Sequence, residues 1–221
     1  MNKVAVIVAG GSGIRMNTDL PKQFLLLKGK PVLYYTIDAF LKAYNDLKII
    51  LVLPEEHIAA GQEIIDAFFD YSKITITAGG RTRFHSVQNG LKLIDEECIV
   101  FVHDGVRCLL NESLIHNCYK AALEFGSAIP VIDSKDSIRL IKEEENEAID
   151  RDRVKLVQTP QAFHSKILLP AFNIDYKDKF TDEATVLEAF GLKVHLIEGD
   201  TKNIKITQPI DLIIAEHLLT D

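Results

Sequence analysis

No apolar run in the sequence approaches the roughly 20 residues that a membrane-spanning helix needs. The short apolar start, MNKVAVIVAGG, lacks the small-residue cleavage site of a signal peptide and is more typical of a strand that ends in a loop. The three cysteines, Cys98, Cys108 and Cys118, are odd in number and lack metal-site spacing, so we expect reduced thiols in the cytoplasm. The net charge of −7 argues against non-specific nucleic-acid binding, but it allows a local positive pocket for a small anion.

Short β-rich apolar runs alternate with helical patterns through most of the 221 residues. The runs are nearly continuous in apolar residues, as parallel strands buried on both faces should be. They are Val4–Ala9, Lys48–Leu53, Ile74–Thr77 and Cys98–Val102. Apolar stripes at helical spacing fall within 33–41, 84–94 and 114–125, and Pro31 suits a first helical turn. This alternation predicts an α/β fold, Rossmann-like, with a mostly parallel sheet and helices on both faces.

The alternation breaks after Val131. Segment 133–152, DSKDSIRLIKEEENEAIDRD, predicts a protruding β-arm, with a disordered charged loop as the alternative. A helix is expected at Thr181–Phe190 with Thr181 as its cap, then a strand at Lys193–Glu198 and a helix at Ile210–Leu219. No linker divides the chain, so we expect one domain over 1–221 with a dimerisation arm at about 133–155.

The stretch VAGGSGIRMNTDLPKQF, Val8 to Phe24, is a glycine-rich turn after the first strand. Such a turn places backbone N–H groups where phosphate oxygens can bind. It matches neither the dinucleotide fingerprint, because Met16 stands at the last glycine position, nor the Walker loop, because Lys22 lies between Pro21 and Gln23. Arg15 and Lys22 could bind the outer oxygens of a polyphosphate and lower the barrier to its transfer, or they could be solvated surface cations.

Six ordered blocks carry a family resemblance. They are AGGSGIRM with LPKQF, GGRTRFHSV (79–87), VHDGVR (102–107), VQTPQAF (157–163), TDEA (181–184) and EGDTKNIKIT (198–207). Together they resemble the sugar-phosphate nucleotidyltransferases, and more narrowly the 2-C-methyl-D-erythritol 4-phosphate cytidylyltransferases of isoprenoid biosynthesis. The resemblance covers nearly the whole chain. It implies transfer of CMP from CTP to 2-C-methyl-D-erythritol 4-phosphate, release of pyrophosphate, a Mg²⁺ requirement and a homodimer.

On the nucleotide side, the resemblance implies that the opening loop wraps the triphosphate, through Ala9, Gly10, Gly11, Ser12 and Gly13. It assigns Arg15 and Lys22 to the transition state at the α-phosphate. It places the region of Gly80, Arg83 and Ser86 at the cytosine and ribose, although Ser86 alone would read as an ordinary polar helix residue. Arg81 stands where some relatives have an acidic residue.

On the acceptor side, the resemblance implies roles for residues from four separate segments. They are Asp104, Arg107, Ser137, Arg151, Thr181 and Lys205. Asp104, which could also be a loop cap, would hold a substrate hydroxyl or help bind Mg²⁺, although no metal ligand is assigned. Arg151 would reach across the dimer interface to the acceptor phosphate, and Lys205 would position that phosphate unless it is a plain strand-end lysine. Ser134 is the alternative to Ser137 for the acceptor contact at the start of the arm. Ile138-Arg139 continues the usual strand and favours Ser137, whereas matching the family pattern without a gap favours Ser134.

Cys108 replaces the family's usual proline after Arg107. We interpret it as a tolerated small residue, because a nucleophilic cysteine would need a partner base that the sequence does not provide.

Two other functions compete with the main prediction. A cytidylyltransferase for another polyol phosphate, such as ribitol 5-phosphate, would share the CTP machinery. A non-catalytic nucleotide-binding module is disfavoured by the presence of Arg15, Lys22, Arg151 and Lys205 together, because a sensor needs no acceptor-side cations.

Overall fold

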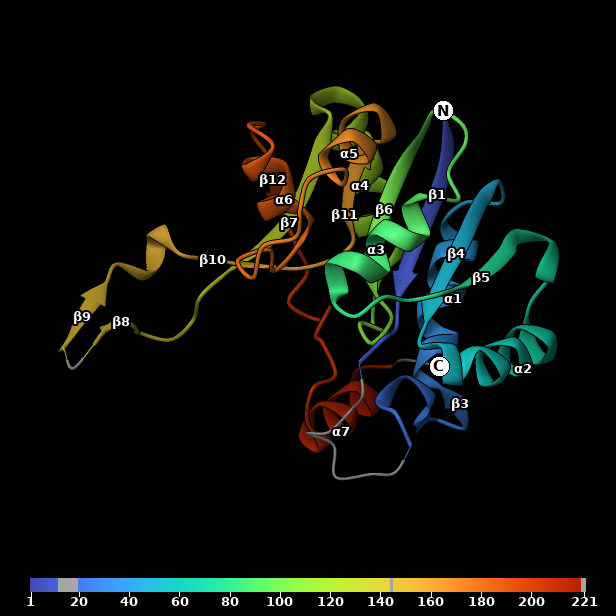
Figure 1. Ribbon diagram of the computed structural model, residues 1–221. Helices are drawn as coiled ribbons and strands as arrows, with labels where there is room; N and C mark the ends of the chain where they lie inside the picture. The colour runs from blue at the N-terminus through green and yellow to red at the C-terminus, as the bar shows by residue number, and fades with distance from the viewer. Residues whose placement is uncertain (12–19, 144, 220–221) are drawn as a thin grey trace.

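The computed structural model describes residues 1–11, 20–143 and 145–219. Figure 1 shows a central sheet with helices on both faces and a two-stranded arm that projects from the body. The sheet has eight strands in the order β10-β7-β11-β6-β1-β4-β5, with β12 also paired to β7. Its strands are β1 (Asn2–Val8), β4 (Leu47–Leu53), β5 (Ile74–Ala78), β6 (Cys98–Asp104), β7 (Ser127–Asp133), β10 (Lys155–Val157), β11 (Gln161–His164) and β12 (Leu196–Glu198).

Four neighbouring strands, β6, β1, β4 and β5, run parallel. β11 is antiparallel to both β6 and β7, so the sheet is mixed but mostly parallel, which confirms the predicted fold class. The interior residues of β1 and all of β6 are buried because helices cover both faces of the sheet. The carboxyl ends of the parallel strands meet at one edge of the sheet, where ligands of open α/β sheets bind.

Two layers of helices sandwich the sheet. The helices are α1 (Val32–Ala43), α2 (Ile58–Phe68), α3 (Arg83–Leu91), α4 (Glu112–Phe125), α5 (Ser165–Ala171), α6 (Glu183–Ala189) and α7 (Pro209–Leu218). α1, α2 and α4 pack on one face, and α3, α5 and α6 pack on the other. α7 covers a smaller cluster with the short strands β2 (Leu26–Leu27) and β3 (Lys30–Pro31). Among the described helices, none has the length and apolar character to cross a membrane.

Local sequence sets where the helices near the strand ends begin. Thr82 caps α3, its hydroxyl accepting from His85 N at 3.4 Å, and Asn111 caps α4, its side chain accepting from Leu114 N at 2.8 Å. α4 ends at Gly126, whose φ of +83° is costly for residues with a Cβ. Because Arg83 directly follows the Thr82 cap, this start fixes Arg83 at the carboxyl-end edge of the sheet.

The helix and strand predictions hold for the main elements, with differences at the boundaries. The expectation that Thr181 caps the helix after it was wrong: Asp182 is the cap, and its carboxylate accepts from Thr185 N at 2.9 Å. Pro31 lies at the N-cap of α1 rather than within its first turn. The strand expected at Lys193–Glu198 is confined to β12, and the sequence analysis missed β7, β11, α2 and α5.

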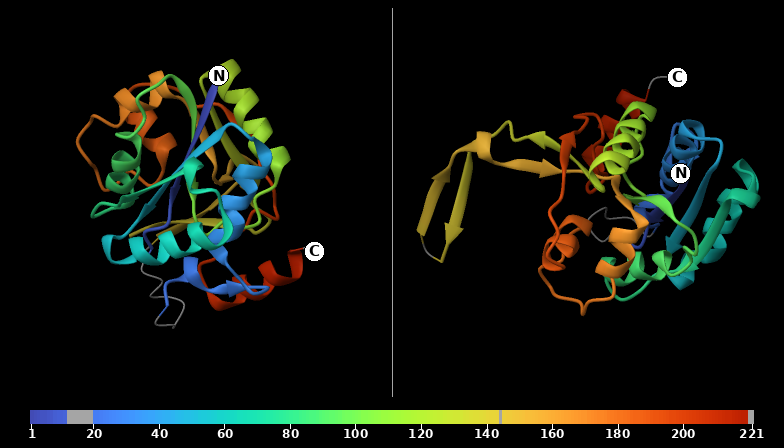
Figure 2. Two further views of the ribbon diagram at one scale, coloured as in Figure 1. Left: turned by 90° about the vertical axis from the view of Figure 1, so that its right-hand side faces the viewer. Right: turned by 90° about the horizontal axis from the view of Figure 1, so that it is seen from above.

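The arm is an antiparallel hairpin of β8 (Ile138–Lys142) and β9 (Glu145–Ile149), with Ile138 paired to Ile149. Most of its side chains are exposed, and the view from above in Figure 2 shows it extending well beyond the body. The prediction of a protruding β-arm is therefore confirmed, and the alternative of a disordered loop is wrong.

Candidate active site

A pocket of about 550 Å³ lies at the carboxyl ends of β1, β4, β5 and β6, as expected for an open α/β sheet. Its walls come from the glycine-rich turn, the loops after the other three strands, the start of α3 and the segment before α7. The lining residues are Val8, Ala9, Gly10, Gly11, Lys22, Gln23, Pro54, Glu55, Glu56, Gly79, Gly80, Arg81, Thr82, Arg83, Ser86, Asp104, Val106 and Lys205.

Two hydrogen bonds to the backbone of Ala9 fix the start of the glycine-rich turn. Ala9 N donates to Val52 O at 2.9 Å, and the buried Gln23 amide donates to Ala9 O at 2.9 Å. A Cβ at Gly105 would lie 2.8 Å from Ala9 Cβ, so glycine is needed where the loop after β6 meets this turn. Among the predicted triphosphate residues, Ala9, Gly10 and Gly11 line the pocket with Lys22. Ser12, Gly13 and Arg15 lie outside the described residues.

The loop after β5 is held by Ser86. The Ser86 hydroxyl accepts from Gly80 N at 3.0 Å and donates to Thr82 O at 3.0 Å. A Cβ on Gly79 would come within 2.9 Å of Ser86 Oγ, and one on Gly80 within 2.4 Å of His85 Cβ. Ser86 therefore shapes the Gly79-Gly80 wall of the pocket as well as lining it.

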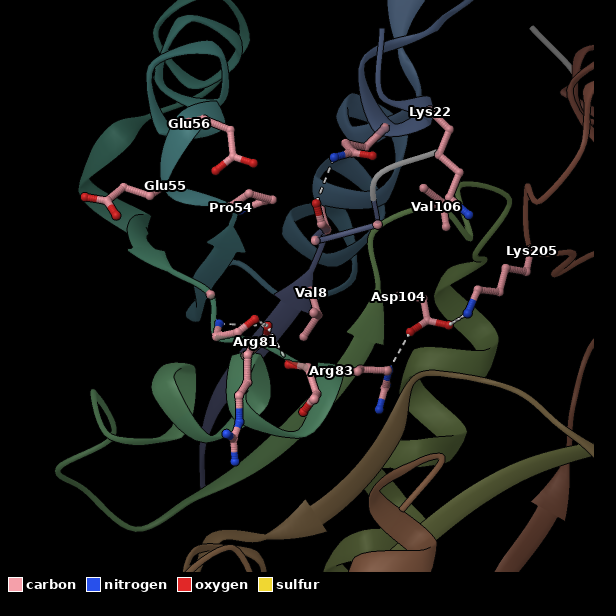
Figure 3. Close-up of a pocket in the computed structure, with 18 residues that line it drawn as sticks. Val8, Lys22, Pro54, Glu55, Glu56, Arg81, Arg83, Asp104, Val106 and Lys205 are labelled. Carbon is pink, nitrogen blue, oxygen red and sulfur yellow. Dashed lines mark hydrogen bonds and ion pairs between the residues drawn. The ribbon is translucent and has the colours of Figure 1, made fainter. Parts of the chain in front are cut away.

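The centre of the pocket is a buried carboxylate between two cations. Asp104, at the end of β6, is only 8% exposed. Its Oδ1 accepts from Arg83 Nε at 3.1 Å, and its Oδ2 lies 2.8 Å from Lys205 Nζ (Figure 3). Arg107 approaches the same carboxylate, with Nε 3.9 Å from Oδ2. The structure thus brings together four predicted site residues from three separate motifs.

These charges set the ionisation of the cluster. Burial opposes ionisation of Asp104, but the positive charges of Arg83 and Lys205 outweigh it and hold its pKa well below the usual range. Burial also opposes the charge on Arg83, and the carboxylates of Glu183 and Asp104 raise its pKa despite that burial. Asp104 therefore remains anionic, and Arg83 remains charged, throughout the neutral range.

A hydrogen-bonded layer lies behind Asp104. Thr159 Oγ1 accepts from Asp104 N at 3.1 Å, and Asn203 Nδ2 donates to Thr159 O at 2.7 Å. Arg107 Nη1 donates to Asn203 O at 2.7 Å, which anchors Arg107 beside the pocket rather than within its lining. His103 is fully buried in this layer, and burial lowers its pKa to about 3.

Three predicted site residues do not reach this pocket in the single chain. Thr181 is exposed just before α6, and Ser137 is exposed at the base of the arm. Arg151 follows β9, where its Nη1 donates to Lys135 O at 3.1 Å. None of these three lines the pocket among the described residues.

Sequence reasoning missed several residues that the structure places at the site. Thr159 and Asn203 lie within blocks already singled out, VQTPQAF and EGDTKNIKIT, so the motifs contained the signal. Glu183 lies in TDEA, where attention went to Thr181, yet its carboxylate is 1% exposed and bonded to Arg83. Glu55 and Glu56 line the pocket beyond β4, outside every motif.

The cysteines contribute no nucleophile to the pocket. All three are free and buried, and burial raises the pKa of Cys108 to about 12, which agrees with its interpretation as a small packing residue. Within residues 1–11, 20–143 and 145–219, no group of three or more His, Cys, Asp or Glu side chains could hold a metal ion.

Comparison with known proteins gives the same family from sequence and from structure. The family model described as 2-C-methyl-D-erythritol 4-phosphate cytidylyltransferase matches residues 3–221. Proteins of that name from Phocaeicola vulgatus and Bacteroides thetaiotaomicron are 45% and 44% identical over 219 residues, covering 99% of this chain and 100% of each relative.

Two solved structures extend the likeness to the fold. The 4-diphosphocytidyl-2C-methyl-D-erythritol synthase of Anaerococcus prevotii superposes with a TM-score of 0.84 at 30% identity, covering 98% of this chain and 95% of its own. The 2-C-methyl-D-erythritol 4-phosphate cytidylyltransferase of Francisella tularensis gives 0.81 at 31% identity, covering 99% and 100%.

Proposed function

This chain belongs to the 2-C-methyl-D-erythritol 4-phosphate cytidylyltransferase family of nucleotidyltransferases, and on that premise we propose its reaction in isoprenoid biosynthesis. It transfers CMP from CTP to 2-C-methyl-D-erythritol 4-phosphate and releases pyrophosphate. The observation that carries the proposal is the pocket itself. One cavity gathers Ala9, Gly10 and Gly11 of the glycine-rich turn with Lys22, Arg83, Asp104 and Lys205, and the family resemblance assigns these residues to the two substrates.

The chemistry is a direct displacement at phosphorus. An oxygen of the acceptor phosphate attacks the α-phosphorus of CTP, and the bond from that phosphorus to the bridging oxygen breaks. The electron pair of that bond leaves with pyrophosphate, so no side chain needs to become covalently attached. Lys22, whose side chain lies over Gly11, stabilises the negative charge that develops on the phosphate oxygens, together with Arg15.

The nucleotide occupies the side of the pocket formed by β1 and β5. The turn from Ala9 to Gly13 wraps the triphosphate, and the Gly79-Gly80 wall held by Ser86 meets the cytosine and ribose. Gly79 and Gly80 let this wall pack closely on α3, because a Cβ on either would collide with Ser86 or His85. Arg83 lies deeper and contacts Asp104.

The acceptor occupies the side of the pocket near Lys205. The Lys205 side chain is 39% exposed and meets the acceptor phosphate, while Asp104 holds a hydroxyl with Arg107 beside it. Thr181 does not line the pocket of the single chain, so no contact with the acceptor is assigned to it. Arg151 and Ser137 complete it from a second copy of the chain. Both residues flank the hairpin of the arm, which projects from the body (Figure 2), so a homodimer that exchanges arms would deliver them to the partner's pocket.

The residues present fit a Mg²⁺ ion held mainly by substrate phosphates. Asp104 is the buried carboxylate among the described acidic residues that line the pocket, whereas Glu55 and Glu56 are exposed. Both oxygens of Asp104 already meet cations, so the phosphate oxygens would supply most ligands, as Mg²⁺ commonly requires. When bound, the ion would neutralise charge on those oxygens.

The three free cysteines suit a cytoplasmic enzyme.

Pyrophosphate release from CTP tests the reaction directly. With Mg²⁺ present, 2-C-methyl-D-erythritol 4-phosphate should be the preferred acceptor, and removal of the metal by a chelator should abolish turnover. With ribitol 5-phosphate as the acceptor, kcat/KM should be much lower. A higher kcat/KM for ribitol 5-phosphate would identify the protein as a cytidylyltransferase for that polyol phosphate. Labelled CTP should leave no label on the denatured protein, and a labelled protein would contradict direct displacement.

A further inference from the structure

Glu183 joins the active site to α6 through Arg83. It is the first residue of α6 and is 1% exposed. Arg83 Nη1 lies 2.5 Å from Glu183 Oε1, and Arg83 Nη2 lies 3.2 Å from Oε2. The third nitrogen of the same guanidinium, Nε, donates to Asp104 at 3.1 Å. One guanidinium group therefore joins two buried carboxylates, one from α6 and one from β6.

This bridge decides how the oxygens of Asp104 are shared. Arg83 donates from Nη1 and Nη2 to Glu183 and only from Nε to Asp104 Oδ1. Asp104 Oδ2 is therefore available to Lys205 Nζ, which lies 2.8 Å away. A guanidinium without Glu183 would present two parallel N–H groups to the nearest carboxylate, a geometry that suits both oxygens of Asp104. Arg83 would then compete with Lys205 for Oδ2.

We infer that Glu183 is a positioning residue for the acceptor side of the site. It holds Arg83 on one oxygen of Asp104, so the other oxygen holds the ammonium group of Lys205 in place for the acceptor phosphate. The inference rests on the proposed function, which assigns that phosphate to Lys205. Nothing in it requires Glu183 to touch either substrate.

The side chain of Gln161 fixes the backbone around Glu183. Gln161, buried at the start of β11, donates through Nε2 to Asp182 Oδ2 and accepts at Oε1 from Ala184 N, both at 2.9 Å. These bonds anchor the residues on either side of Glu183 to the strand that pairs with β6. The Glu183 carboxylate is therefore placed by the sheet that also carries Asp104.

Glu183→Gln tests the inference because glutamine keeps the shape and one acceptor oxygen but loses the charge. The KM for 2-C-methyl-D-erythritol 4-phosphate should rise about tenfold, while the KM for CTP and kcat stay within about twofold. Lys205→Ala should also raise the acceptor KM. In the Lys205→Ala background, Glu183→Gln should change the acceptor KM no further, since both act through one contact.

Thr185→Ala is the matched control, because it removes the Thr185 side-chain half of the α6 capping box and leaves the bonds of Arg83 in place. It should lower Tm and leave both KM values unchanged. If Lys205→Ala raises the acceptor KM and Glu183→Gln does not, the positioning role of Glu183 is wrong and the proposed function stands. An acceptor KM that Lys205→Ala also leaves unchanged would overturn the assignment of the phosphate to Lys205 as well. Additive effects in the double variant would overturn the route through Lys205.

Arg83→Lys tests the same bridge should Glu183→Gln not fold. Lysine keeps the charge of Arg83 but has no planar fork to join two carboxylates. Because Arg83 also belongs to the nucleotide side of the pocket, only the acceptor KM is diagnostic here: it should rise, and an unchanged acceptor KM would overturn the inference.

Discussion

Charged side chains gather in two regions of this molecule, the pocket and the arm, and burial separates the two. In and directly behind the pocket, Asp104 and Glu183 are 8% and 1% exposed, and Arg83 bonds to both. In the arm, Lys142 and Glu147 form an ion pair at 2.8 Å while 63% and 54% of their side chains remain exposed. The same types of charged residue are therefore shielded from water in the pocket and exposed to it in the arm.

The difference teaches which charges fix geometry. A buried charge that loses its partner costs several kcal/mol, so the pocket charges hold one another in defined positions. An exposed pair contributes little, so the arm is not ordered by its own charges. The arm also exposes Leu140 and Ile141, which are 41% and 68% accessible, and burying them against a second copy would stabilise it. The charges that line the pocket hold one another within one chain, whereas we propose that the arm packs against a second copy.

Lys22→Ala should have the largest effect, because it removes the pocket cation that we propose stabilises the transition state. We expect kcat to fall about a hundredfold to a thousandfold, corresponding to roughly 2–4 kcal/mol, with a much smaller rise in the KM for CTP. Steady-state kinetics with varied CTP measures both values.

Lys120→Ala provides the matched control for Lys22→Ala, because Lys120 is an exposed lysine on α4 outside the pocket. It should leave both parameters unchanged. If Lys22→Ala changed only the KM for CTP, Lys22 would act in ground-state binding and not on the developing charge.

Arg151→Ala tests whether the arm completes the partner's pocket. Alone, this variant should be nearly inactive, as Lys22→Ala is. When the two proteins exchange subunits, each mixed dimer has one site that lacks both cations and one intact site. A random mixture should recover up to about a quarter of wild-type activity, because half of its dimers are mixed.

Subunit exchange must be shown independently, for example by native mass spectrometry of differently tagged chains. No recovery after proven exchange would place Arg151 in the pocket of its own chain or outside any pocket.

The contrast between pocket and arm also explains how much the sequence could predict. Apolar continuity identified β1, β4, β5 and β6, and their parallel order then placed Asp104 at the pocket edge. Short strands such as β11 escaped notice because four residues carry too little pattern.

Contacts between distant segments were beyond sequence reasoning. The bond between Arg83 and Glu183 joins residues a hundred positions apart, and no local spacing records it. Asp182, not Thr181, caps α6, and this choice depends on which side chain reaches Thr185 N. Thr181 and Asp182 are adjacent and both residue types can cap a helix, so the sequence alone does not tell which of them does.

His103 should make stability depend on pH through the buried layer behind the pocket. Burial lowers its folded pKa to about 3, whereas the unfolded value is about 6.5. Between these values the unfolded state binds the extra proton, so the free energy of unfolding falls as pH falls. His103 should contribute about 1.4 kcal/mol per pH unit within this window, or about 2 kcal/mol between pH 6.5 and pH 5.

Denaturant unfolding of the wild type and of His103→Gln at pH 7 and pH 5 measures that contribution. The variant should be less stable at pH 7, because His103 contacts Thr159 and the Arg107 carbonyl. Its loss of stability between the two pH values should be about 2 kcal/mol smaller than that of the wild type. Equal losses in both proteins would show that His103 is not held neutral.

The smallest effect is expected at the tip of the arm, where the double variant Lys142→Ala/Glu147→Ala removes the exposed ion pair. An isolated exposed pair contributes at most about 1 kcal/mol, so Tm should change by less than about 4 °C. The kinetic parameters should be unchanged, because neither residue lines the pocket. Calorimetry and steady-state kinetics provide the measurements. A larger fall in Tm would mean that a partner chain buries the tip, and these charges would then belong with those of the pocket.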